Sequence, residues 1–140
     1  MRNKLRLVID ANVFVSFILK NDSVPGRAVF KALEVGNLLL SKEVLLELIE
    51  VFAKKKFDRY TLLSDRIAFL RKLYRTSTVI LPNIEIKASL DPKDNKYLEL
   101  AVCGRADFIV SGDKKHLLTL SSFQGIPILS PRQFIELDIQ

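Results

Sequence analysis

The chain has 140 residues, of which 49% are apolar and 27% charged, with a net charge of +6 at neutral pH. These values are typical of one globular domain, and we expect residues 1–140 to form a single unit without linkers or repeats. The single cysteine excludes an internal disulfide or a cysteine-based zinc site, and the first apolar run is too short for a secretory signal or a membrane span, so we expect a cytoplasmic protein.

Segments with the pattern of strands alternate with segments of helical periodicity along the whole chain. The first strand is predicted at 5–9, and four more apolar runs bounded by turn residues predict strands at 37–40, 79–81, 107–110 and 126–129. Serine, aspartate, proline and glycine mark where the helices begin and end. Helices are predicted at 13–19, from Pro25 to Gly36, from Ser41 to about Lys54, from Ser64 onward, from Asp91 to Gly104, through Leu118, and from Pro131.

This alternation predicts the fold class, a three-layer α/β/α domain with a mostly parallel sheet of about five strands. Pro127 lies within the last strand and predicts an edge position for it. The periodicity of the helix from Ser64 also predicts its two faces. Its inner face is expected to carry Ile67, Leu70, Leu73 and Tyr74. Its outer face is expected to carry Arg66, Arg71, Lys72 and Arg75.

The first strand runs directly into a carboxylate, Asp10, and then an amide, Asn12. A charge at the end of a buried strand needs an explanation, because an unpaired buried charge is costly. In open α/β sheets, ligands bind in the crevice beyond the carboxyl ends of the strands. We therefore interpret Asp10 as the first ligand of an acidic, metal-binding pocket.

Two further acids follow predicted elements that open onto the same edge of the sheet. Asp113 lies just past the strand at 107–110, and it would lie beside Asp10 if those two strands are neighbours. Asp94 lies in the first turn of the helix that begins at Asp91. Helix capping offers an explanation that needs no chemistry, since Asp113 could cap the helix behind it and Asp94 could complement the helix dipole.

Glu47 borders the apolar stripe of the helix from Ser41, whereas Glu43 and Glu50 fall opposite that stripe. A carboxylate that leans toward the core needs a partner, because an unpaired buried charge is expensive. An arginine could supply that partner, and so could a metal ion shared with the other acids.

Four acids that converge in one pocket repel one another unless protons or cations neutralise them. Oxygen ligands without a histidine or cysteine cluster select Mg²⁺ or Mn²⁺ over zinc. Two such ions would activate a water and stabilise the leaving oxygen in phosphodiester cleavage. Asn12 and Ser111 are neutral groups that could orient a ligand or a metal-bound water.

Four segments, at 8–13, 41–47, 91–95 and 109–113, together resemble the PIN-domain nucleases over nearly the whole chain, and most of all the VapC-like toxins of toxin–antitoxin pairs. The resemblance implies that the catalytic, metal-binding acids of the family correspond to Asp10, Glu47, Asp94 and Asp113. Its small polar residues correspond to Asn12 and Ser111. The function implied is that of a Mg²⁺- or Mn²⁺-dependent endoribonuclease acting on RNA, and a homodimer and an inhibiting antitoxin protein are common in the family.

The positive charge fits an RNA partner, because setting the four acids aside raises the net charge of the rest of the chain from +6 to +10. A basic run with two interleaved aromatics could bind phosphates and stack bases; its cations are Lys54, Lys55, Lys56 and Arg59. The same run could instead be a solvated loop whose aromatics pack on the core. Lys114 and Lys115 adjoin Asp113 and are better placed to meet substrate phosphate. The one histidine, His116, fits a helix surface better than a catalytic role.

Two other functions remain open. A non-catalytic RNA- or protein-binding module of the same PIN-like fold would use the acids structurally, and it would neither cut RNA nor respond to Mg²⁺ or Mn²⁺ through them. A phosphoryl-accepting receiver domain ranks last, because it needs an aspartate after a mid-chain strand. The strand at 79–81 is followed instead by Pro82 and Asn83.

Overall fold

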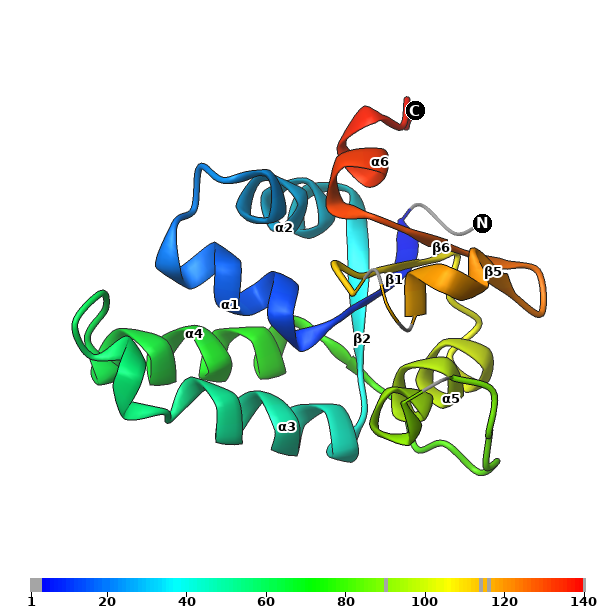
Figure 1. Ribbon diagram of the computed structural model, residues 1–140, viewed down its shortest axis with the longest axis horizontal. Coiled ribbons are helices and arrows are strands. Elements are labelled where there is room, and N and C mark those ends of the chain that lie inside the picture. Colours follow the sequence, from blue (N-terminus) through cyan, green and yellow to red (C-terminus); the bar gives the residue numbers. More distant parts are fainter. Residues whose placement is uncertain (1–3, 90, 114, 116, 140) are drawn as a thin grey trace.

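The computed structural model describes residues 4–89, 91–113, 115 and 117–139, and the elements within these ranges are labelled in Figure 1. The strands are β1 (Leu5–Ile9), β2 (Gly36–Leu40), β3 (Thr78–Val79), β4 (Phe108–Val110), β5 (Ser122–Phe123) and β6 (Ile126–Leu129). The α-helices are α1 (Ala11–Leu19), α2 (Val24–Val35), α3 (Lys42–Phe52), α4 (Leu63–Thr76), α5 (Asn95–Cys103) and α6 (Pro131–Glu136). Short 3-10 helices are η1 (Lys55–Phe57), η2 (Pro92–Asp94) and η3 (Leu117–Leu120). No helix in the described ranges is long and apolar enough to cross a bilayer.

The described strands form one sheet in the order β3-β2-β1-β4-β6-β5. All pairings are parallel except that of β5 with β6. Helices α1, α2 and α6 cover one face of the sheet, and α5 covers the other (Figure 1). The predicted three-layer α/β/α class is therefore confirmed, with six described strands in place of about five.

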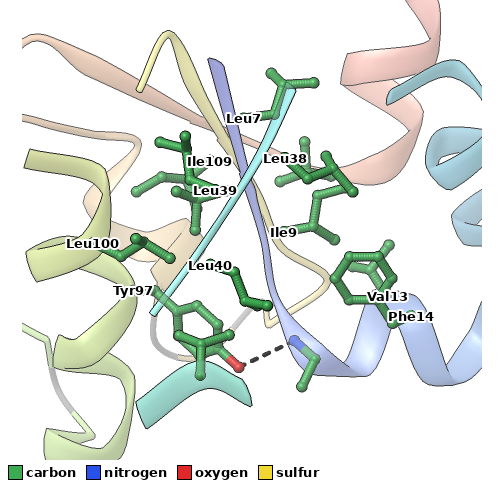
Figure 2. Packing of buried hydrophobic residues seen from close by; sticks show 14 of the residues in the cluster. Leu7, Ile9, Val13, Phe14, Leu38, Leu39, Leu40, Tyr97, Leu100 and Ile109 are labelled. Carbon is green, nitrogen blue, oxygen red and sulfur yellow. Dashed lines mark hydrogen bonds between the residues drawn. The ribbon is translucent and has the colours of Figure 1, made fainter. Parts of the chain in front are cut away.

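The hydrophobic core occupies both faces of the sheet, because neighbouring residues of a strand point in opposite directions. Leu39 and Leu100 pack between the sheet and α5, whereas Ile9 and Val13 lie on the side of α1 (Figure 2). Strands that are buried on both faces read as continuous apolar runs, which is the pattern of the sequence from 7 to 9 and from 38 to 40.

Polar residues in front of the helices satisfy backbone groups that a helix end leaves without an internal partner. The Ser41 hydroxyl accepts the N–H of Val44 at 3.2 Å, and the Asp91 carboxylate accepts the N–H of Lys93 at 3.0 Å. Both helix starts were predicted, although the helix after Asp91 begins with the 3-10 turn η2 before α5. The helix predicted from Ser64 begins at Leu63 without a side-chain cap.

The prediction that the strand containing Pro127 lies at an edge is wrong. Strand β6 pairs with both β4 and β5. A proline is tolerated there because the pairing with β4 involves only Ile128 and Leu129, so the missing N–H of Pro127 removes no bond to β4. The edge is formed by β5, a two-residue strand that the sequence pattern did not reveal.

The predicted faces of α4 are partly wrong. Leu70 and Leu73 are buried as expected, but Ile67 and Tyr74 are exposed. Arg66, expected on the outer face, is only 1% exposed and is among the largest buried side chains. Its guanidinium donates to the carbonyls of Phe52 at 2.9 Å and Lys54 at 3.1 Å, and it pairs with Asp58. Arg66 is buried because it satisfies backbone carbonyls at the end of α3.

Candidate functional site

Asp10 and Ser111 are the residues that directly follow two neighbouring strands, β1 and β4, and they lie side by side at the ends of those strands. Ile9 of β1 pairs with Val110 of β4, so the next residue of each chain segment emerges at the carboxyl edge of the sheet. The N–H of Asp10 still donates to the Val110 carbonyl at 3.0 Å, and the Ser111 hydroxyl donates to Asp10 Oδ2 at 2.8 Å. The Asp113 N–H in turn donates to the Ser111 hydroxyl at 3.0 Å. Parallel pairing thus brings the regions around Asp10 and Asp113 together.

Asp10 is a buried carboxylate whose electrostatic environment favours the protonated form. Its burial is the largest cause of a raised pKa, and the negative charges of Glu47 and Asp113 raise the pKa further. Two hydrogen bonds act in the opposite direction, one from the Asn12 N–H at 3.0 Å and one from Ser111. Asp10 also caps α1 through the bond from Asn12.

The carboxyl groups of Asp94 and Asp113 lie within hydrogen-bonding reach of each other, so a proton on Asp94 can be shared with Asp113. Partial burial, this interaction and the nearby charges of Asp10, Asp113 and Asp91 raise the pKa of Asp94 to about 7. An acid that holds its proton near neutral pH marks a place where negative charge is concentrated.

Glu47 is half-buried on α3 and reaches two residues of α5. The Tyr97 hydroxyl donates to Glu47 Oε1, and the Lys96 ammonium lies 3.3 Å from Glu47 Oε2. The arginine considered as a structural partner for Glu47 is therefore not its partner; a lysine and a tyrosine are. Glu47 still faces the other acids, because its charge raises the pKa of Asp10.

Tyr97 connects the helices that carry the acids, and the sequence analysis missed it. It is fully buried, and its hydroxyl accepts the N–H of Ala11 at 3.1 Å while donating to Glu47 (Figure 2). Burial and the nearby negative charges of Asp10 and Glu47 raise the pKa of Tyr97, so the hydroxyl keeps its proton as a donor. Its position three residues after Asp94, on the inner face of a predicted helix, was the available signal.

All four predicted acids thus meet at one edge of the sheet, carried by the end of β1, by α3, by η2 and by the segment after β4. Their donor chemistry suits a hard divalent cation, because every group is a carboxylate and the negative charges of Glu47, Asp10 and Asp113 raise the pKa of neighbouring acids. In the described residues, however, no three Asp, Glu, His or Cys side chains are arranged as a formed metal centre. The Lys96 ammonium pairs with Glu47 in this arrangement, and the raised pKa values of Asp10 and Asp94 favour their protonated forms.

The capping explanations for two of the acids hold alongside this convergence. Asp113 Oδ1 accepts the N–H of Lys115 at 3.1 Å, and its carbonyl accepts the N–H of Leu118 at 3.1 Å. Asp94 stands at the start of α5 but makes no side-chain capping bond there. Capping therefore accounts for part of the Asp113 geometry, and Asp94 lies in the first turn of η2, where the helix-dipole explanation placed it.

The predicted RNA-binding cations lie in two different places. Lys54, Lys55, Lys56 and Arg59 are exposed around η1, between α3 and α4, at the opposite end of these helices from α5 (Figure 1). Lys54 lies seven residues after Glu47. At a rise of 1.5 Å per helical residue, the two residues are roughly 10 Å apart along the axis of α3. Lys115 is exposed and adjoins the acids, whereas Lys114 and His116 lie outside the described residues.

The aromatics of that basic run behave differently from one another. Phe57 is buried with the Lys56 ammonium 5.2 Å from its ring centre, as the solvated-loop interpretation expected. Tyr60 is 65% exposed beneath the Arg59 guanidinium. The run follows the last turn of α3, whereas Glu47 lies in the middle of that helix, so the run is a separate surface from the cluster of acids.

A sequence model of the PIN domain matches residues 6–115, a range that contains all four acids together with Asn12, Tyr97 and Ser111. The chain is also similar to an uncharacterized protein of Methanocaldococcus jannaschii. The two are 25% identical over 142 residues, which cover 95% of this chain and 91% of the relative.

Proposed function

The chain belongs to the PIN domain family, whose members are typically nucleases, and we propose that it is an endoribonuclease that hydrolyses RNA phosphodiester bonds with Mg²⁺ or Mn²⁺. The proposal takes residues 1–140 as one catalytic domain in the cytoplasm. The observation that carries it is the convergence of Asp10, Glu47, Asp94 and Asp113, each from a different element, with raised pKa values at Asp10 and Asp94.

The side chains around the acids would hold them in place for this reaction. Divalent ions, when bound to Asp10, Glu47, Asp94 and Asp113, would supply an activated water and stabilise the leaving oxygen of the phosphodiester. Ser111 orients the Asp10 carboxylate, and Tyr97 fixes Glu47 relative to the start of α1. Asn12 is exposed next to Asp10 and is placed to contact substrate.

The test is cleavage of single-stranded RNA by purified protein in Mg²⁺, in Mn²⁺ and in EDTA. We expect cleavage with either ion and none in EDTA. We expect Asp10→Asn to reduce the cleavage rate at least 100-fold, about 3 kcal/mol in the barrier, while the circular dichroism spectrum stays unchanged. Asp22→Asn is the matched control, because Asp22 is exposed in the turn between α1 and α2. Metal-dependent cleavage by Asp10→Asn at the wild-type rate would contradict the proposed site.

We also propose that the protein acts as the toxin of a toxin–antitoxin pair, as its likeness to VapC-like toxins implies. Its expression should then arrest growth of a bacterial host, and the Asp10→Asn variant should not. A neighbouring reading frame that encodes a small DNA-binding protein, and that restores growth when co-expressed, would supply the antitoxin. If expression of the active nuclease does not affect growth, the protein is a nuclease but not the toxin of a toxin–antitoxin pair.

A second candidate is a non-catalytic RNA- or protein-binding module. One observation favours it: Glu47 already has two partners within the protein, Lys96 and Tyr97. This candidate predicts RNA binding without cleavage under any divalent ion, and binding that Asp10→Asn leaves unchanged. The same cleavage assay, run beside a filter-binding assay, separates the two candidates.

A further inference from the structure

A cavity of about 640 Å³ opens beside the first turns of α5, and the proposed nuclease function leaves it without a role. Its walls come from three segments: the start of α3, the loop around 85–89, and the stretch from η2 into α5. The residues that matter for its chemistry are Ile86, Ser89, Pro92, Lys93, Asn95 and Lys96. Its volume lies within the range of about 300–1,000 Å³ typical of small-molecule sites.

The cavity adjoins the cluster of acids. Lys96 lines the cavity, and its ammonium lies 3.3 Å from Glu47 Oε2. Asp94 stands in the chain between Lys93 and Asn95, both of which line the cavity. A strand of RNA whose phosphodiester lies over the acids would therefore have its adjacent nucleotide over this cavity.

The cavity lining carries Lys87, Lys93 and Lys96 beside Glu43, Glu85 and Glu99, and Lys93 and Lys96 are the lysines next to Asp94 in the chain. Two of the three glutamates have partners within the protein, since Glu99 accepts the Ile86 N–H at 2.9 Å and Glu85 lies 3.7 Å from the Lys87 ammonium. Lys93 is exposed on the side of Asp94. A polyanion that approaches four acids needs such positive groups close by, because phosphate contacts supply most of the affinity for nucleic acids.

The other basic surface does not meet this need. The cations around η1 lie beyond the last turn of α3, away from α5 (Figure 1). Ile86 and Pro92 add an apolar surface to the cavity beside the polar Ser89 and Asn95, a mixture that suits a nucleobase and its ribose.

We propose that this cavity binds the nucleotide next to the scissile phosphate of a single-stranded RNA, with Lys93 and Lys96 contacting its phosphate group. The inference rests on the proposed nuclease function, which it deepens by naming the side on which the substrate strand lies. Lys93 is the informative residue, because its side chain makes no described contact with the acids, whereas Lys96 also holds Glu47.

The first test measures RNA binding without cleavage. The full chain with Asp10→Asn is titrated in Mg²⁺ with a fluorescein-labelled uridine hexanucleotide, and anisotropy gives the Kd at several salt concentrations. Adding Lys93→Ala should raise the Kd several-fold and reduce the slope of log K against log salt by about 0.7, the loss of one phosphate contact. Lys72→Ala, an exposed lysine on α4, should change neither value. If Lys55→Ala weakens binding and Lys93→Ala does not, the strand lies along η1 and the proposal is wrong.

The second test locates the nucleotide. Amide resonances of 86–89 and 93–96 should shift in ¹⁵N spectra when the same hexanucleotide is added, and those of 54–60 should not. Shifts confined to other segments, in a protein that cleaves RNA, would overturn the cavity assignment and leave the nuclease intact. A wild-type protein that neither cleaves nor binds RNA would overturn the proposed function itself, and this inference with it.

Discussion

Asp94 illustrates how much the environment of one carboxyl group can change its behaviour. Its pKa is raised to about 7 by partial burial, by the bond with Asp113 and by neighbouring negative charges. The folded protein therefore holds a proton there at pH values where the unfolded chain has already lost it. Stability from this group is present below the unfolded pKa of 3.8, and it is lost as the pH rises toward 7.

Replacing Asp94 should remove part of this pH dependence. We expect Asp94→Asn to be more stable than the wild type at pH 8 in EDTA, by an amount on the order of 3 °C in Tm, because the partly exposed carboxylate is screened by water. At pH 4 the two proteins should differ little. Thermal unfolding by circular dichroism at both pH values measures the effect, with Asp22→Asn as control. A wild type and a variant that lose the same stability between pH 4 and pH 8 would contradict this account.

Tyr97 acts through other groups, since its hydroxyl links the Ala11 N–H to Glu47 and contacts no proposed substrate atom. The phenylalanine variant keeps the ring and removes only the hydroxyl. The buried Ala11 N–H then loses its acceptor, and Glu47 loses the donor that fixes its position. A buried polar group without its partner costs about 1–3 kcal/mol.

Tyr97→Phe should therefore lower the free energy of unfolding by about 1–2 kcal/mol. It should also raise the Mg²⁺ concentration for half-maximal cleavage by roughly 10-fold, because groups that orient metal ligands typically have effects of 10–100-fold on metal affinity. Tyr74→Phe is the matched control, since Tyr74 is exposed on α4. A variant that loses stability without any change in Mg²⁺ dependence would assign Tyr97 a structural role only.

At the scale of elements, α3 and α4 are joined through the buried side chain of Arg66. The last carbonyls of a helix have no partners within it, and Arg66 satisfies the carbonyls of Phe52 and Lys54 from the neighbouring helix. The guanidinium also pairs with Asp58, which orders the turn that contains η1. A helical wheel places Arg66 next to exposed positions, because periodicity does not reveal which backbone groups lie opposite.

Arg66→Met should remove these bonds while keeping most of the aliphatic volume. We expect a loss of about 3 kcal/mol in the free energy of unfolding, or roughly 10 °C in Tm, because two carbonyls and a carboxylate lose their donor. Arg71→Met, at an exposed position of the same helix, should be within about 0.5 kcal/mol of the wild type. Chemical denaturation of both variants tests this, and equal stabilities would show that the Arg66 contacts contribute nothing net.

At the scale of the whole molecule, α3 and α4 present apolar side chains to the outside. Leu46 and Ile49 of α3 are about half exposed, as are Leu63, Ile67 and Tyr74 of α4. The two helices pack side by side below the sheet (Figure 1). Groups of exposed apolar residues often mark protein interfaces, and we propose that a second copy of the chain covers this face in the homodimer that the family likeness implied.

Ile49→Glu should then convert the dimer into a monomer in sedimentation velocity experiments. The expected cause is the cost of burying an unpaired charge at the interface. Leu33→Glu changes an exposed leucine on α2, away from this face, and should leave the dimer intact. A wild-type protein that sediments as a monomer at micromolar concentration would exclude this dimer.

The alternation of apolar runs and helical periodicity was enough to predict a mostly parallel three-layer fold and the starts of several helices. Parallel strands carry their carboxyl ends to one edge, so the positions of Asp10 and Asp113 after two such strands predicted their proximity. These features depend on local periodicity and chain order, which the amino-acid sequence contains directly.

The contacts between elements were decided only by the tertiary structure. The partners of Glu47 are Lys96 and Tyr97 because α5 packs across α3, and the burial of Arg66 follows from the end of α3 lying against α4. The edge position belongs to β5, which pairs with β6 on the side away from β4. Periodicity predicts which face of an element is apolar. It does not predict which groups of another element contact that face, because those groups come from distant parts of the chain.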